Sequence, residues 1–292
     1  MKIWFQERLC EARDARVSVY DHGFLYGDGI YETVHAYNYH VFHWNGHFER
    51  LKNSARRIEL RVPWSSRSLH DRVGKVLAAN HSPNASVRIT IARGPGPIGL
   101  NPAVCPRPTL VMLPLPHRDV APIWKRGISI GITAICRNHT RCLDPQIKSN
   151  NSLNTILARV EAEKMRVFEG VLTNLDGYLT EGTISNIFFV KNGELYTPAL
   201  ECGLLEGVTR GALLKRAKLA GLRVHEGRYT PRDLLRAEEA FLASTTLEVA
   251  PIVRIKIAGS RKVHRVGNGR PGVVTRRLHA LFRSYVDQEV KN

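Results

Sequence analysis

The chain has 292 residues, of which 43% are hydrophobic, and a formal net charge of +17. That length favours two domains, and that composition favours an ordered globular protein. We expect no membrane span, because no stretch is long and apolar enough, and no secretory signal at the charged start of the chain. The five cysteines show no CxxC spacing, so neither a metal site nor a disulfide framework is predicted. Free thiols in a cytoplasmic protein are the expectation.

The positive charge makes nucleic-acid binding the main rival function. The densest basic stretch lies between residues 254 and 277, and the other Lys and Arg residues are scattered along the chain. No basic motif with interleaved aromatic residues and no recognition-helix signature is present. We therefore expect a basic solvated surface that attracts anionic small molecules, with no specific nucleic-acid partner.

Residues 1–115 predict a first, N-terminal domain of strands and helices. Alternating apolar and polar residues predict two short strands over 1–20, and a glycine-rich turn follows over 21–29. The further expected elements are strands over 30–37, 41–43, 87–92 and 109–113 and helices over 44–58 and 66–80.

Prolines 114, 116 and 122 disfavour helix and central strand, so residues 116–124 are predicted to be a linker. Residues 125–292 then predict a second domain. Its expected elements are a strand over 127–135, a helix over 151–168, hairpins about Asp176-Gly177 and Asn192-Gly193, a helix over 208–220 ended by Gly221, a strand over 241–243 and a helix over 273–285. The 151–168 helix carries an apolar stripe of Leu153, Ile156, Leu157, Val160, Ala162 and Met165.

Two residues suggest a particular cofactor. Lys148 is followed, a predicted helix and a hairpin later, by Glu181 on a strand. An amine and a carboxylate on neighbouring elements suit pyridoxal 5′-phosphate. The lysine can form a Schiff base with the aldehyde, and the carboxylate can keep the pyridine nitrogen protonated. Either residue alone is more often a solvated surface charge.

Three further segments are suited to an oxyanion. Residues 203–210 run from a glycine turn into a helix, whose first N–H groups and Thr209 hydroxyl favour an anion. Ser244-Thr245-Thr246 places hydroxyl residues and free amides after an apolar strand. Arg50 is a permanently charged fork on a helix of the first domain. The ordinary alternatives are a capped helix, a turn and a surface arginine.

Together these segments resemble the class IV aminotransferases, which are fold-type IV pyridoxal-phosphate enzymes. The matching strings, in the family's order and approximate spacing, are Tyr26-Gly27-Asp28-Gly29-Ile30-Tyr31-Glu32-Thr33, His47-x-x-Arg50-Leu51, Lys148-Ser149-x-Asn151-x-Leu153, Glu181-Gly182-x-x-Ser185-Asn186, Gly207-Val208-Thr209-Arg210 and Ser244-Thr245-Thr246. The resemblance implies an α/β (α+β) fold of two domains, a small N-terminal one and a larger C-terminal one with a barrel-like sheet, with the cofactor between them. It also implies a homodimer.

The resemblance implies a role for each matching residue. Lys148 matches the Schiff-base lysine, which also moves the substrate's Cα proton, and Glu181 matches the partner of the ring nitrogen. The implied phosphate contacts are Arg50, Val208, Thr209, Ser244 and Thr245, and Leu205 would pack against the ring. The implied substrate contacts are Tyr31, His35, Arg88 and Thr246, and no metal is implied.

Three activities share this scaffold: branched-chain L-amino acid transamination, D-amino acid transamination and aminodeoxychorismate lyase. The Arg and His that bind the substrate carboxylate in the usual D-enzymes are replaced by Ile98 and Leu100. Arg88 matches branched-chain enzymes, whereas His35 stands where the resemblance implies an arginine and Ser86 where it implies a tyrosine. The favoured prediction is a pyridoxal-phosphate-dependent transaminase acting on an aliphatic, preferably branched-chain, amino acid and a 2-oxo acid such as 2-oxoglutarate. The D-amino acid transaminase and the lyase remain alternatives.

Overall fold

The computed structural model describes residues 1–115 and 119–291. The chain divides into two compact units. The first comprises Met1–Arg118, Ile147–Ser152 and Glu289–Asn292, and the second comprises Asp119–Gln146 and Leu153–Gln288. The segment that carries Lys148 therefore belongs to the first unit, although it lies far along the chain from the rest of that unit. The boundaries at 115 and 125 stay a prediction.

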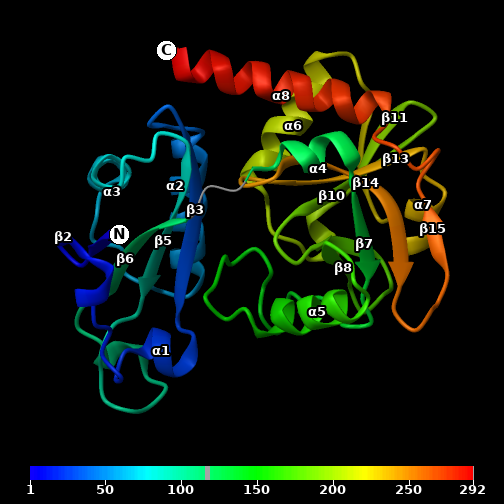
Figure 1. Ribbon diagram of the computed structural model, residues 1–292. Coiled ribbons are helices and arrows are strands. Elements are labelled where there is room, and N and C mark those ends of the chain that lie inside the picture. The colour runs from blue at the N-terminus through cyan, green and yellow to red at the C-terminus, as the bar shows by residue number, and fades with distance from the viewer. Residues whose placement is uncertain (116–118, 292) are drawn as a thin grey trace. The chain divides into compact units, whose positions relative to one another are not determined.

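The first unit contains a six-stranded antiparallel sheet with the strand order β2-β1-β6-β5-β3-β4 (Figure 1). Its strands are β1 (Lys2–Phe5), β2 (Arg8–Glu11), β3 (Gly29–Tyr37), β4 (His40–Val41), β5 (Ala85–Ala92) and β6 (Thr109–Leu115). The helices are α1 (His22–Tyr26), α2 (Trp44–Arg57) and α3 (Ser66–Ala79), with 3-10 turns at Ala12–Asp14 and Pro102–Val104. Along β3 buried and half-buried residues alternate, so Glu32 points to the face opposite that of Tyr31 and His35.

The second unit contains a nine-stranded mixed sheet that closes on itself. Its strands are β7 (Ile128–Ile132), β8 (Glu169–Thr173), β9 (Leu179–Gly182), β10 (Asn186–Lys191), β11 (Glu194–Pro198), β12 (Val224–Gly227), β13 (Glu239–Ser244), β14 (Glu248–Ile257) and β15 (Val263–Arg265). The path runs β12-β11-β10-β13-β14-β7-β8-β9, with β15 beside β14. Because β9 also pairs with β10, through Glu181 and Asn186, the strands from β10 round to β9 form a ring. The expected α/β fold with a barrel-like sheet is confirmed.

Helices cover different sides of this second sheet. They are α4 (Ala121–Arg126), α5 (Leu153–Lys164), α6 (Val208–Leu219), α7 (Pro231–Leu235) and α8 (Val273–Lys291), with a 3-10 turn at Leu200–Cys202. Within the second unit, Figure 1 shows α4, α6 and α8 gathered on one side of the sheet and α5 on another. The two expected hairpin turns are present, with φ of 81° at Gly177 and 71° at Gly193.

Two elements that contain a proline differ from the expectation. Residues 116–118 of the expected linker lie outside the described residues, but 121–124 belong to α4, whose first turn contains Pro122. A proline there removes no helical hydrogen bond. Strand β14 was not expected, and it contains Pro251. Pairing between β14 and β7 begins only at the next residue, Ile252, so the missing N–H leaves no gap in that ladder.

The apolar stripe on α5 does not form a core. Ala158 and Ala162 are buried, whereas Leu153, Ile156, Leu157 and Val160 are between 44% and 62% exposed. Large apolar side chains on one exposed helix face indicate a surface that contacts something else.

Two expectations from composition can be compared with the structure. All five cysteines are free thiols. Every helix in the described part of the chain is too short or too polar to cross a bilayer.

Glu169, at the start of β8, is a fully buried carboxyl group. Its Oε1 accepts hydrogen bonds from the Ser185 hydroxyl at 2.8 Å, the Ile184 N–H at 2.9 Å and the Thr183 hydroxyl at 3.4 Å, so it fixes the turn between β9 and β10. Its Oε2 is buried and has no hydrogen-bond partner among the described residues. Burial raises the pKa of Glu169 to about 7, although these hydrogen bonds oppose the shift.

We predict that Glu169→Gln removes a pH dependence of stability. Because the pKa in the folded protein lies above its ordinary value of 4.5, the folded state keeps a proton that the unfolded chain releases. The wild type should therefore lose up to roughly 3 kcal/mol of stability as the pH rises through the interval between these pKa values, and the variant should not. Thermal unfolding from pH 5 to pH 8 measures this. The Tm of the variant relative to wild type should rise with pH, and a constant difference would contradict the assignment.

Candidate functional site

The predicted site residues fall into two groups, one in each unit. The first unit holds Tyr31, His35, Arg50, Arg88 and Lys148, and the second holds Glu181, Leu205, Val208, Thr209, Ser244, Thr245 and Thr246.

Lys148 is fixed to the start of β3 by its backbone. Its carbonyl accepts the Tyr31 N–H at 2.9 Å, and its own N–H donates to the Ser54 hydroxyl of α2 at 3.1 Å. A bridge between Ile30 and Ser149 continues this pairing. The side-chain Nζ lies 4.5 Å from the centroid of the Tyr31 ring. The sheet and α2 therefore place this amine against a tyrosine.

Arg88, like Lys148, lies against the ring of Tyr31. Its guanidinium carbon lies 3.6 Å from the Tyr31 ring centroid, and its nitrogens donate to Thr90 at 3.2 Å and Asn150 at 3.4 Å. The positive charge of Lys148 lowers the pKa of Tyr31; burial opposes this shift, and Arg88 adds to it. Two cations around one half-buried ring form a place that attracts carboxylates.

The His35 side chain contacts a residue on the neighbouring strand β5. Its Nδ1 lies 2.8 Å from the Ser86 hydroxyl, the residue directly opposite on β5. These are two of the positions at which the sequence departs from the branched-chain pattern, and they lie opposite each other on β3 and β5. The His35 imidazole stands at the position where an arginine was expected, and the Ser86 hydroxyl stands where a tyrosine was expected.

Arg50 lies on the helix-covered side of the sheet, where it pairs with Glu32. Its Nε and one terminal nitrogen donate to the two carboxylate oxygens at 2.6 and 2.8 Å, and His47 Nδ1 lies 2.9 Å from the same group. Burial alone would raise the pKa of Glu32, but the charge and hydrogen bonds of Arg50, with His47, hold it well below its usual range. No role was predicted for Glu32 or His47, although both lie in segments that resemble the family. They orient Arg50 as a fixed charge.

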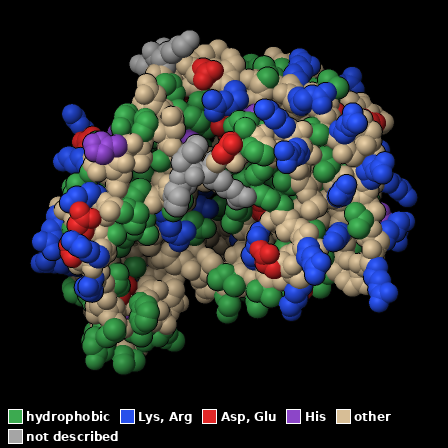
Figure 2. Space-filling view, in the orientation of Figure 1, with side chains coloured by type: hydrophobic (Ala, Val, Ile, Leu, Met, Phe, Trp, Pro, Cys, Tyr) green, Lys and Arg blue, Asp and Glu red, His purple; other side chains and the backbone are tan. Residues whose placement is uncertain are grey.

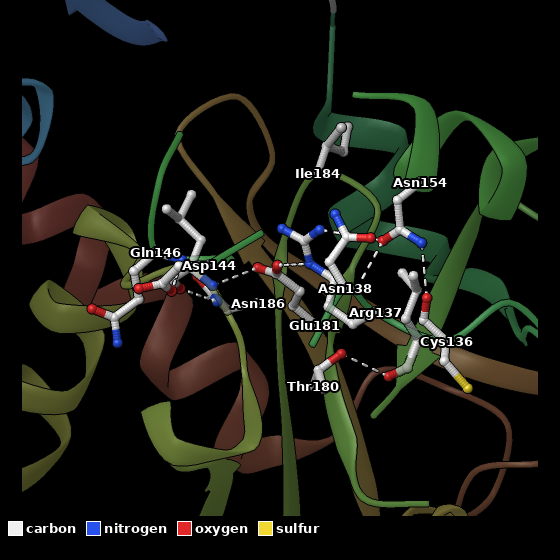
Figure 3. A network of polar contacts seen from close by, with 12 residues as sticks. Cys136, Arg137, Asn138, Asp144, Gln146, Asn154, Thr180, Glu181, Ile184 and Asn186 are labelled. Carbon is white, nitrogen blue, oxygen red and sulfur yellow. Dashed lines mark hydrogen bonds and ion pairs between the residues drawn. The ribbon is translucent and has the colours of Figure 1, made fainter. Parts of the chain in front are cut away.

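Glu181 is held at both carboxylate oxygens in the second unit (Figure 3). Oε1 accepts from Arg137 Nε at 2.7 Å and Oε2 accepts from the Leu205 N–H at 3.1 Å. Arg137 also donates to Asn154 Oδ1 at 3.3 Å. The sequence analysis missed Arg137, because a single arginine in an irregular segment gives no pattern. Its contacts fix the orientation of the carboxylate.

Asn186 connects Glu181 to the start of α6. It pairs with Glu181 across the ring closure, and its side-chain amide donates to the Leu205 carbonyl at 3.0 Å. A Cβ on Gly207 would lie 1.9 Å from Asn186 Oδ1, so only glycine fits there. Asn186 also pairs with Ala243, the residue before Ser244. One residue thus brings the carboxylate, the helix start and the end of β13 together.

The donors at this place suit a phosphate group. Helix α6 begins after Gly207, which provides no side-chain cap, so within the described part of the chain its first amides, including those of Val208 and Thr209, are not capped by that residue. The Ser244 hydroxyl is buried and has no hydrogen-bond partner among the described residues. Such donors are what an oxyanion requires. The described residues contain no cluster of His, Cys, Asp and Glu that could hold a metal.

Comparison with known proteins gives one consistent family. The model of amino-transferase class IV matches residues 29–255. A putative branched-chain-amino-acid aminotransferase from Methanocaldococcus jannaschii is 35% identical over 97% of this chain and 96% of that protein. A D-alanine aminotransferase from Listeria innocua is also 35% identical, over 97% of this chain and 95% of that protein.

Solved structures that resemble this chain are named as aminotransferases as well. A branched-chain aminotransferase from Thermoproteus uzoniensis with norvaline has a TM-score of 0.89 and 30% identity, and the match covers 99% of this chain and 95% of that one. A branched-chain amino acid aminotransferase from a T.th. strain, complexed with N-(5′-phosphopyridoxyl)-L-glutamate, has a TM-score of 0.90 and 25% identity over 99% of this chain and 94% of that one.

We predict that Gly207→Ala disrupts the turn over 205–207 that precedes α6. The added Cβ must displace the Asn186 amide, which releases Leu205. Overpacking of this kind should lower the stability by about 1–3 kcal/mol and weaken pyridoxal phosphate binding. Gly211→Ala, on the same helix, is the matched control. Its Cβ would meet nothing within 4 Å, and it should raise stability by up to about 1 kcal/mol. Thermal unfolding and cofactor titration measure both effects, and equal behaviour of the two variants would contradict the prediction.

Proposed function

Since the chain belongs to the class IV aminotransferase family, we propose that it moves an amino group between a branched-chain or other aliphatic amino acid and a 2-oxo acid such as 2-oxoglutarate. The observation that carries the proposal is the placement of Leu205. Its N–H holds Glu181, and the uncapped start of α6 follows within three residues. An acceptor for a ring nitrogen and donors for a phosphate are therefore built into one turn, which suits pyridoxal 5′-phosphate.

The cofactor supplies an aldehyde and an electron-withdrawing ring. We assign to Lys148 the covalent link to the cofactor and the transfer of the proton at the substrate's Cα. Glu181 keeps the ring nitrogen protonated. Arg50, held by Glu32, contributes positive charge toward the phosphate. Tyr31 and Arg88 provide the polar contacts for substrate carboxylates.

The loop over 93–102 has apolar residues at the two positions where D-amino acid transaminases carry an Arg and a His, and this supports the proposal of aliphatic substrates. Ile98 and Leu100 cannot bind a carboxylate by charge, and both are strongly exposed apolar side chains. Arg88 can take the second carboxylate of glutamate or 2-oxoglutarate while leaving an aliphatic side chain unhindered. The names of the archaeal relatives, one of them solved with norvaline, point the same way.

D-alanine transamination is the second candidate. The Listeria relative named for that activity has the same identity to this chain, 35%, as the Methanocaldococcus one. The His35–Ser86 pair favours it as well, because the chain lacks the arginine and tyrosine expected of branched-chain enzymes at these positions.

A half-reaction panel separates the candidates. The holoenzyme is mixed with L-leucine, L-valine, L-glutamate or D-alanine, and conversion of the cofactor to pyridoxamine phosphate is followed by its absorbance. We expect conversion with the three L-amino acids. Conversion by D-alanine alone would move the chain to the D-specific branch, and no conversion by any of them would contradict transamination of these substrates.

Borohydride reduction followed by peptide mapping tests the cofactor assignment in the same preparation. The adduct should lie on Lys148 and be absent from Lys148→Ala. Lys52→Ala is the control, because Lys52 is a half-exposed lysine of the same unit. An adduct on another lysine would show that Lys148 has a different role.

We also propose a homodimer. The exposed face of α5 formed by Leu153, Ile156, Leu157 and Val160 supports it. So does a second apolar surface in the first unit, where hydrophobic side chains gather over α1 (Figure 2). Sedimentation should give twice the mass of the 32.9 kDa chain. Ile156→Asp should shift the equilibrium toward monomer and Glu163→Ala, on the exposed end of the same helix, should not. A monomeric wild type would refute the proposal.

The five free cysteines support a cytoplasmic location, where thiols stay reduced. Fractionation of the source cells would test it, and recovery outside the cytoplasm would refute it.

A further inference from the structure

We propose that Glu248 is a positioning residue for the phosphate of the cofactor: together with His279 and Arg283 it holds the turn that contains Ser244, Thr245 and Thr246 in its binding shape. The inference rests on the proposed function in one respect, that pyridoxal phosphate is the ligand. Glu248 does not itself belong to the predicted phosphate contacts.

The turn has an unusual backbone at its end. Ser244, the last residue of β13, pairs with Glu248, the first of β14, so residues 245–247 make the turn. Glu248 has a φ of 56°, in the left-handed region. For a residue other than glycine this costs about 1–2 kcal/mol. Surrounding contacts must therefore hold it.

Those contacts come from two helices. Glu248 is buried, with one carboxylate oxygen 2.9 Å from His279 Nε2 and the other accepting from Arg283 at 2.8 Å. These two residues of α8 are four apart and so share one face. Leu247 is also buried, and its carbonyl accepts the Trp124 indole N–H of α4 at 3.0 Å. The Trp124 and His279 rings lie 4.3 Å apart, which joins the two anchors.

The anchoring is confined to one end of the turn. Leu247 and Glu248 are buried, whereas Thr246 is exposed. The Ser244 hydroxyl is buried but has no hydrogen-bond partner among the described residues. The turn is thus anchored to α4 and α8 through residues 247 and 248, and its hydroxyl donors lie at residues 244–246. Without the carboxylate, the strained backbone at 248 has no compensation from α8 and relaxes, so the donors over 244–246 move. The loss should fall on the phosphate group of the ligand.

The experiment compares pyridoxal phosphate with pyridoxal, which lacks the phosphate. Apoprotein is titrated with each, and the dissociation constants are read from absorbance. In Glu248→Gln the constant for pyridoxal phosphate should rise about tenfold, as for the loss of roughly 1.4 kcal/mol of binding. The constant for pyridoxal should stay within about twofold of wild type, since RT ln 2 is only about 0.4 kcal/mol.

Glu194→Gln is the matched control. Glu194 is also paired with an arginine and a histidine, Arg223 at 3.1 Å and His225 at 2.9 Å, but on β11, outside the phosphate-binding turn. It should leave both constants unchanged. Arg283→Gln should repeat the phosphate-specific loss from the helix side, and Arg283→Lys should restore part of the affinity. These two variants decide the question if Glu248→Gln does not fold.

Each other outcome overturns the inference. An equal loss for both ligands in Glu248→Gln would show a general structural defect, and an equal effect of Glu194→Gln would show that any such ion pair matters. Unchanged binding in Glu248→Gln would refute the positioning role and leave the proposed function standing. Failure of the wild-type protein to bind pyridoxal phosphate would refute the proposed function itself.

Discussion

The pairing of Glu181 with Asn186 is the constraint on which the second unit depends. It joins β9 to β10 and closes the ring of strands. Once the backbone is paired there, Glu181 meets the N–H of Leu205, and the Asn186 amide meets its carbonyl. Both backbone groups of Leu205 are therefore hydrogen-bonded, and α6 begins three residues later at Val208. Closure of the sheet therefore also brings together the proposed acceptor for the ring nitrogen and the proposed donors for the phosphate.

Buried carboxylates recur as supports for the groups that would contact the cofactor. Glu32 holds Arg50, Glu181 is held by Arg137, and Glu248 ties its turn to Arg283. A buried charge is tolerated only with such partners, and removing one partner typically costs about 3–5 kcal/mol. Several arginines of this basic chain are thus engaged internally. On the one face that Figure 2 shows, Lys and Arg side chains lie at separate places rather than in one stripe. That distribution suits a solvated surface better than a nucleic-acid groove.

Sequence patterns predicted the parts of the fold that depend on local periodicity. Strand β3, helix α2 and the turn at Asn192-Gly193 follow from alternation, helical spacing and glycine chemistry. The position of Lys148 on the first unit could not be predicted, because it arises from pairing between distant segments. Glu248 was not predicted for the same reason, because its partners on α8 lie far along the chain, and Arg137 was not predicted because its irregular segment gives no pattern. The α5 stripe was correctly recognised as apolar, but one sequence cannot distinguish a core face from an exposed one.

The proposed role of Glu181 is to keep the ring nitrogen of pyridoxal phosphate protonated. The most direct measurement is the ¹⁵N NMR signal of cofactor labelled at that nitrogen, in wild-type holoenzyme and in Glu181→Gln. The wild type should show a protonated ring nitrogen that persists above neutral pH, because a hydrogen-bonded carboxylate stabilises the pyridinium. The amide variant should show an unprotonated nitrogen under the same conditions. An unprotonated nitrogen in the wild type, or a protonated one in the variant, would contradict the role assigned to Glu181.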